Sequence, residues 1–117
     1  LYRVRGGDLA LLTADHTMFG EPFWGQDSVP CDLPHTNRLV RANGIEPTVT
    51  VAHGETELRA GDLFLLCTDG LSGMVTPADL SDALRDVHGL ADAGAALIQR
   101  APHAGGRDNA SAILVRV

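Results

Sequence analysis

Apolar and polar residues alternate along several short stretches of the chain, which is the pattern of β-strands that bury one face. Residues 1–5 and 8–13 alternate on either side of Gly6-Gly7, and paired glycines favour the tight turn of a β-hairpin. The same pattern predicts a strand over 48–52, a turn or short strand over 57–59, and a last strand over 111–117. Residues 63–68 are apolar without alternation, which predicts a central strand buried on both faces.

Two later stretches have helical periodicity. Thr76 is a good N-cap and Pro77 suits the first helical position, so a helix is predicted to begin there. Apolar residues then recur at helical spacing as far as Val87, and Gly89 is a natural stop. A second helix is predicted over 90–100, ended by Pro102 and two glycines, and a short one over 36–42.

Strands and helices are thus mixed, with antiparallel hairpins early in the chain and a pair of helices late in it. This order favours an α+β fold of antiparallel β-sheets flanked by helices over an alternating parallel fold. Residues 14–44 are irregular and contain three prolines, which predicts a long surface loop.

Composition excludes several mechanisms. The 117 residues carry a net charge of −6, and all nine basic residues are arginine. A chain without lysine cannot use a P-loop lysine or a Schiff base, and an acidic chain poor in aromatic residues is not expected to bind nucleic acid. No apolar run approaches the ~20 residues of a membrane span. Cys31 and Cys67 form no CxxC pair, so we expect a reducing, cytoplasmic setting.

Two aspartates stand at the ends of predicted strands. Asp69 directly follows the apolar run, and Asp108 precedes the last strand. Carboxylates that converge from neighbouring strands would suit a hard cation such as Mg²⁺ or Mn²⁺, whereas the five scattered histidines suggest no zinc site. Asp-Gly and Asp-Asn are also common turn formers, so spacing alone leaves both interpretations open.

Four blocks together resemble the metal-dependent protein phosphatases of the PP2C (PPM) type. GDLFLLCTDGL at 61–71 is similar to the family's GD-x-[apolar]-LL-C-[ST]-DGL block, and DNAS at 108–111 to its late DN-x-[ST] block. LTADHT at 12–17 resembles its LT-x-DH-[ST] block. Residues 34–44 resemble its HP-x-x-N…RA-x-G segment, although Leu33 stands where histidine is expected.

This resemblance implies a four-layer αββα sandwich with a binuclear Mn²⁺ or Mg²⁺ centre at one end. It implies hydrolysis of phosphoserine and phosphothreonine in proteins by a water held between the two metals. Asp69 and Asp108 would be metal ligands, Gly70 and Asn109 would support them, and residues 18–44 would form a flap beside the cleft.

The acidic blocks of the family's first half are missing from the chain. The resemblance therefore implies that residues 1–117 are the C-terminal portion of one phosphatase domain, and the chain alone is expected to be inactive. The alternative is a non-catalytic remnant, or a regulatory or binding module, that keeps the fold.

Overall fold

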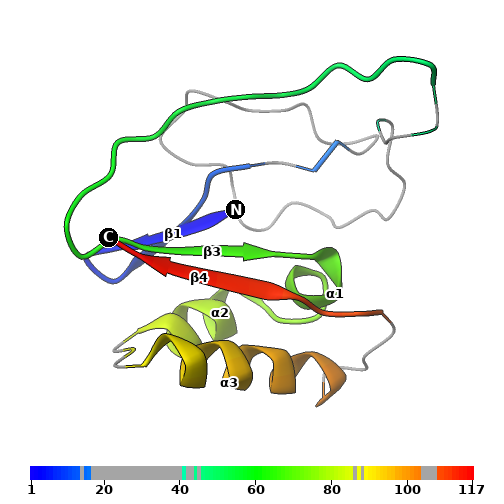
Figure 1. Cartoon of the computed structure of the whole chain (residues 1–117). Coiled ribbons are helices and arrows are strands. Elements are labelled where there is room, and N and C mark those ends of the chain that lie inside the picture. The colour runs from blue at the N-terminus through cyan, green and yellow to red at the C-terminus, as the bar shows by residue number, and fades with distance from the viewer. Residues whose placement is uncertain are drawn as a thin grey trace.

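A computed structural model gives the fold of the chain, and it describes residues 1–13, 15–16, 41, 44, 46–85, 87, 89–103 and 108–117. Four strands form one antiparallel sheet in the order β2-β1-β3-β4. Three helices lie between β3 and β4 in the chain, and α2 and α3 pack on one face of the sheet (Figure 1). The elements are β1 (Tyr2–Arg5), β2 (Asp8–Leu11), β3 (Leu63–Cys67), α1 (Asp69–Ser72), α2 (Pro77–Leu84), α3 (Leu90–His103) and β4 (Ala112–Arg116). The predicted α+β class is confirmed.

The predicted hairpin is present as β1 and β2. Gly6 and Gly7 have φ angles of 60° and 91°, which is the left-handed region that a tight turn requires and that glycine adopts without strain. β1 also pairs with β3, which makes β3 a central strand between β1 and β4. In the β3–β4 register Cys67 stands opposite Ala112, so the end of β3 meets the beginning of β4.

The core lies between the sheet and the helices. Leu65 of β3, Leu80 of α2 and Leu97 of α3 are completely buried there, together with Leu71 of α1. Thr76 caps α2 as predicted, because its hydroxyl accepts a hydrogen bond of 3.2 Å from the backbone amide of Asp79. Among the described residues, no helix is long and apolar enough to cross a membrane.

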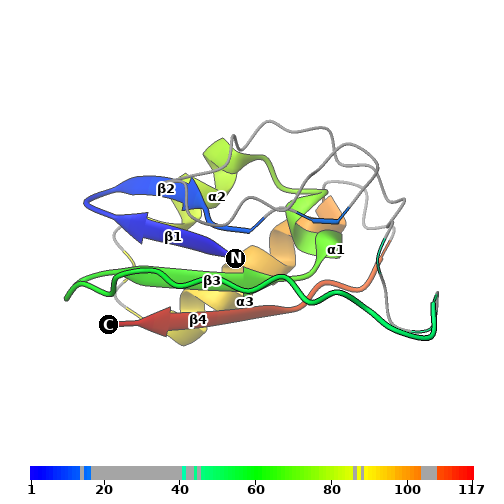
Figure 2. The same ribbon diagram turned by 90° about the horizontal axis from the view of Figure 1, so that it is seen from above.

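The opposite face of the sheet exposes apolar side chains. Leu66 of β3 is 44% exposed and Ile113 of β4 is 62% exposed, and Val115 and Val117 lie open beside them. The prediction that the apolar run is buried on both faces is therefore wrong at Leu66, since no second layer covers it in the described part of the chain. Residues 46–60 run along this side of the sheet, away from the helices (Figures 1 and 2).

Several predicted boundaries differ from the structure. No strand forms over 48–52, where Val51 is 73% exposed and pairs with no described strand, and none forms over 57–59. α2 ends at Leu84 because Arg85 adopts an extended backbone, which leaves Val87 beyond the helix. α3 continues past residue 100 to His103, so Pro102 lies within the helix and does not end it. The expected helix over 36–42 and flap over 18–44 lie outside the described residues, apart from positions 41 and 44.

Candidate metal centre

The two candidate aspartates lie at the same end of the sheet. Asp69 is the first residue of α1, two positions after the last residue of β3, and Asp108 lies four positions before the first residue of β4. Because β3 and β4 are antiparallel neighbours, the residues that follow one strand and precede the other come together. Figure 1 shows α1 beside the beginning of β4. The sequence did not predict α1, a helix of only four residues.

Gly70 brings the two acidic segments into contact. This glycine is buried, and a Cβ atom added to it would lie 2.8 Å from the carbonyl carbon of Asn109 and closer still to its oxygen. Real Cβ atoms essentially never approach backbone so closely, so only glycine allows this packing. Gly70 therefore allows close contact between the Asp69-Gly70 and Asp108-Asn109 segments, while the supporting role of Gly70 and Asn109 at a metal site stays a prediction.

Thr68 links the same two segments through its side chain. Its hydroxyl donates a hydrogen bond of 3.3 Å to the carbonyl oxygen of Asn109 and accepts one of 3.0 Å from the backbone amide of Ser111. Its own amide donates to the carbonyl of Ser111 at 3.1 Å. No sequence pattern predicted a role for Thr68. The available signal was a hydroxyl residue at the end of a buried strand, directly before a candidate ligand.

Both carboxylates are open to solvent. Asp69 Oδ1 accepts a hydrogen bond of 2.9 Å from the amide of Gly70, and Asp108 Oδ1 accepts one of 2.7 Å from the amide of Asn109. Their Oδ2 atoms accept no hydrogen bond from the described residues, and two exposed carboxylates form a donor set that suits Mg²⁺ or Mn²⁺.

The described residues supply only part of a coordination shell. In the ranges that the structure describes, no group of three or more histidine, cysteine, aspartate or glutamate side chains could hold a metal ion. Mg²⁺ commonly binds through one or two protein carboxylates, completing its shell with waters and substrate oxygens. Asp69 and Asp108 therefore fit a hard cation as part of its ligand set.

Cys67 lies close to the candidate centre but has the wrong chemistry for a nucleophile. Its free thiol is half-buried on the helix side of the sheet, where it packs against the core. Burial raises the pKa of this thiol, which favours the protonated and unreactive form. The expectation that Cys67 acts as a small hydrophobic residue agrees with this environment.

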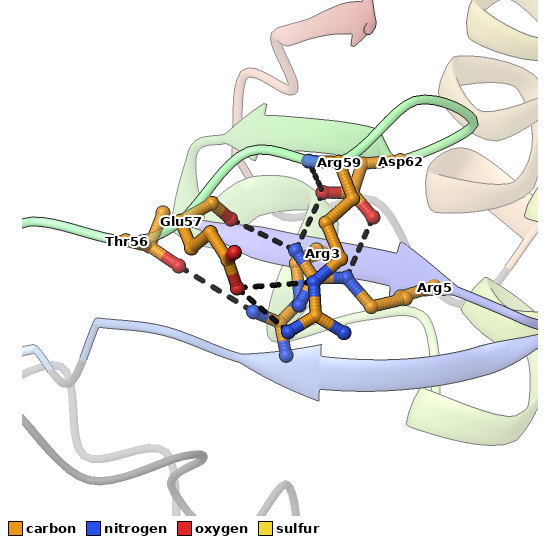
Figure 3. Close-up of polar contacts among 6 residues, drawn as sticks. All are labelled: Arg3, Arg5, Thr56, Glu57, Arg59 and Asp62. Atoms are coloured by element: carbon orange, nitrogen blue, oxygen red, sulfur yellow. Dashed lines mark hydrogen bonds and ion pairs between the residues drawn. The ribbon is translucent and has the colours of Figure 1, made fainter.

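A second polar cluster lies at the other end of β3 (Figure 3). Asp62, which is 1% exposed, accepts hydrogen bonds of 2.7 Å from Arg5 Nε and from Arg5 Nη2, and one of 2.8 Å from the amide of Arg59. The Arg5 hydrogen bonds hold the pKa of the Asp62 carboxyl well below its usual range, although burial acts in the opposite direction. The sequence indicated a turn at Gly61-Asp62, which is present, but it missed this ion pair.

The chain is similar to bacterial serine/threonine phosphatases. It is 32% identical over 117 residues to the serine/threonine phosphatase Stp of Listeria welshimeri. This alignment covers 97% of this chain and 46% of the relative. Among solved structures it matches PppA, a key regulatory component of T6SS in Pseudomonas aeruginosa, with a TM-score of 0.79 and 30% identity over 98% of this chain and 46% of that one. It also matches the Streptococcus agalactiae serine/threonine phosphatase, with a TM-score of 0.78 and 28% identity over 99% of this chain and 50% of that one.

The matches cover almost all of this chain but only part of each matched protein. The chain spans about half the length of the Listeria relative and of the two matched structures. No family model matches the chain. The similarity nevertheless runs through almost all of residues 1–117, in sequence and in fold alike. Over nearly its whole length, the chain therefore resembles the PP2C-type serine/threonine phosphatases.

Proposed function

We propose that this chain is part of a protein phosphatase that removes phosphate from phosphoserine and phosphothreonine with the help of Mn²⁺ or Mg²⁺. The observation that carries the proposal is the contact between the segments that carry Asp69 and Asp108, at the adjoining ends of β3 and β4. The similarity to serine/threonine phosphatases over 97% of the chain supports a metal-binding role for the two aspartates over a role in turns alone.

Each site residue has a definite task in this proposal. Asp69 and Asp108 would hold the cation through their carboxylate oxygens, while Gly70 and Asn109 keep the two segments in contact. Bound divalent cations supply activation of water and neutralise charge on phosphoryl oxygens. In the net reaction a water oxygen bonds to phosphorus, the ester P–O bond breaks, and the serine or threonine oxygen leaves with a proton.

We propose further that the chain is one portion of a larger phosphatase domain. It spans 46% of the Listeria relative, and one face of its sheet exposes Leu66, Ile113 and Val115. Exposed apolar patches on a sheet favour burial against another layer. The remaining metal ligands would come from that other portion, which is why we expect the 117 residues alone to be inactive.

The alternative function is a non-catalytic regulatory or binding module. The observation that favours it is the small ligand set, since the described residues offer no group of three metal-binding side chains. Such a module would keep the fold without turning over a phosphoester.

Calorimetric titration with Mn²⁺ separates the two functions on the chain itself. The phosphatase proposal predicts uptake of Mn²⁺ that Asp69→Ala or Asp108→Ala abolishes and that Asp8→Ala leaves unchanged, since Asp8 is an exposed carboxylate on β2. A longer protein that contains this chain should hydrolyse p-nitrophenyl phosphate with Mn²⁺, and EDTA or Asp69→Ala should stop it. Titration curves that are identical for the wild type and for both site variants would favour the non-catalytic module.

A further inference from the structure

We infer that Thr68 is a positioning residue for the candidate metal centre, an inference that rests on the proposed function. Its hydroxyl holds the Asp108-Asn109 segment against the beginning of α1. The evidence is the pair of hydrogen bonds that this one oxygen makes across the two segments, 3.3 Å to the carbonyl of Asn109 and 3.0 Å from the amide of Ser111.

The geometry requires a hydroxyl at this position. Oγ1 acts as donor to one backbone group and as acceptor from another, which an aliphatic side chain of the same shape cannot do. The Asn109 carbonyl that receives the hydrogen bond is also the group against which Gly70 packs. Thr68 and Gly70 therefore both contact the carbonyl group of Asn109, which lies one residue after Asp108.

The side chain is not needed for the pairing of β3 with β4. The amide of Thr68 donates to the carbonyl of Ser111 at 3.1 Å, and its carbonyl accepts from the amides of Leu71 and Ser72 at the beginning of α1. These backbone bonds continue the ladder and begin the helix without the hydroxyl. What the hydroxyl adds is a restraint on residues 109–111, which belong to the segment that carries Asp108.

Removal of the Thr68 hydroxyl is expected to lower the affinity of the chain for Mn²⁺. Residues that orient metal ligands without touching the metal commonly change affinity by about 10- to 100-fold when they are replaced. Thr68 makes only two side-chain bonds to backbone, both exposed to solvent, so we expect a loss at the lower end, about tenfold, in Thr68→Val. Thr68→Ser keeps the hydroxyl and should retain the wild-type affinity.

The experiment measures Mn²⁺ binding by calorimetry and amide hydrogen exchange by NMR on the 117-residue chain. Thr76→Val is the matched control, because it removes the hydroxyl that caps α2, in a different part of the fold. We expect weaker Mn²⁺ binding in Thr68→Val only, and faster exchange of the Ser111 amide in Thr68→Val but not in Thr68→Ser. Unchanged affinity in Thr68→Val, or an equal loss in Thr76→Val, would overturn the inference.

A wild-type chain that takes up no Mn²⁺ would count against the proposed metal function, and amide exchange would still decide the role of Thr68. In that case, protection of the Ser111 amide that Thr68→Val reduces and Thr68→Ser restores would support Thr68 as the residue that holds the segment. Exchange rates that are identical in all three chains would refute that role.

Discussion

The guanidinium of Arg5 donates two hydrogen bonds of 2.7 Å to the carboxylate of Asp62, a residue 57 positions further along the chain. Arg5 is the last residue of β1, and Asp62 directly precedes β3. A third hydrogen bond, from Arg5 Nη2 to the carbonyl of Glu57, extends the contact to the loop that leads into β3 (Figure 3). The pair therefore fastens residues 57–62 to the sheet at the end opposite Asp69.

Replacing either member of this pair should destabilise the fold. Arg5→Met would leave the Asp62 carboxylate buried without its partner, and removing one partner of a buried pair is more harmful than removing both. We expect the midpoint of urea unfolding to fall more in Arg5→Met than in the double variant Arg5→Met/Asp62→Leu. Glu57→Gln is the control, because the Glu57–Arg59 pair is exposed and should contribute little. Equal midpoints for Arg5→Met and the wild type would show that Asp62 needs no cation.

The same pair predicts a dependence of stability on pH. The hydrogen bonds from Arg5 keep the pKa of Asp62 in the folded chain below the value of about 3.9 expected when it is unfolded. As the pH falls below that value, the unfolded chain binds a proton at Asp62 before the folded chain does, so the free energy of unfolding decreases. The contribution of the Arg5–Asp62 pair to the free energy of unfolding is fully present at neutral pH and is lost in acid.

Urea unfolding at a series of pH values between neutral and acid measures this contribution. The stability difference between the wild type and Asp62→Asn should be constant near neutral pH and should shrink in acid, whereas the difference for Glu57→Gln should stay small throughout. A difference between the wild type and Asp62→Asn that is unchanged in acid would contradict the low pKa of Asp62.

Sequence patterns predicted the elements whose formation depends on residues near one another in the chain. The hairpin follows from Gly6-Gly7, the beginning of α2 from Thr76 and Pro77, and the strand β3 from its apolar run. The predicted strand over 48–52 was wrong because alternation describes a suitable surface but not a neighbouring strand to pair with. α2 is shorter than its periodicity suggested because the backbone of Arg85 leaves the helical region.

The sequence named two candidate ligands but not the contacts that bring their segments together. Asp69 and Asp108 stand at strand ends, and the antiparallel pairing of β3 with β4 brings those ends together. The contact between the two segments depends on long-range interactions that no local pattern encodes. These are the packing of Gly70 on Asn109 and the two hydrogen bonds of Thr68, which join residues more than 35 positions apart. The Arg5–Asp62 pair was missed for the same reason.

Gly70→Ala should damage both the fold and the candidate centre. The added methyl group would overlap the carbonyl group of Asn109, which is backbone and cannot move aside as a flexible side chain can. We expect a loss of roughly 1–3 kcal/mol in the free energy of unfolding, typical of overpacking, together with weaker Mn²⁺ binding. Gly94→Ala is the control, because its added methyl would lie 3.9 Å from Leu114 Cδ1 in an ordinary contact on α3.

Gly94→Ala should instead stabilise the chain by about 0.5–1 kcal/mol, because glycine is unfavourable inside a helix. Urea unfolding and Mn²⁺ calorimetry measure both variants. A Gly70→Ala chain as stable as the wild type, with unchanged Mn²⁺ affinity, would show that the two acidic segments do not need this close contact.

The exposed face of the sheet predicts that the isolated chain associates with itself. Ile113 and Val115 of β4 project from this face beside Leu66, and an apolar sheet surface in water favours burial against another surface. Ile113→Thr/Val115→Thr should reduce concentration-dependent association in sedimentation velocity while keeping the fold, because threonine retains the β-branched shape that suits a strand. Leu65→Ala, on the buried face of β3, should cost about 2–5 kcal/mol in unfolding free energy instead. Association that persists unchanged in the double variant would place the contact on another surface and would weaken the argument that a second layer covers this face.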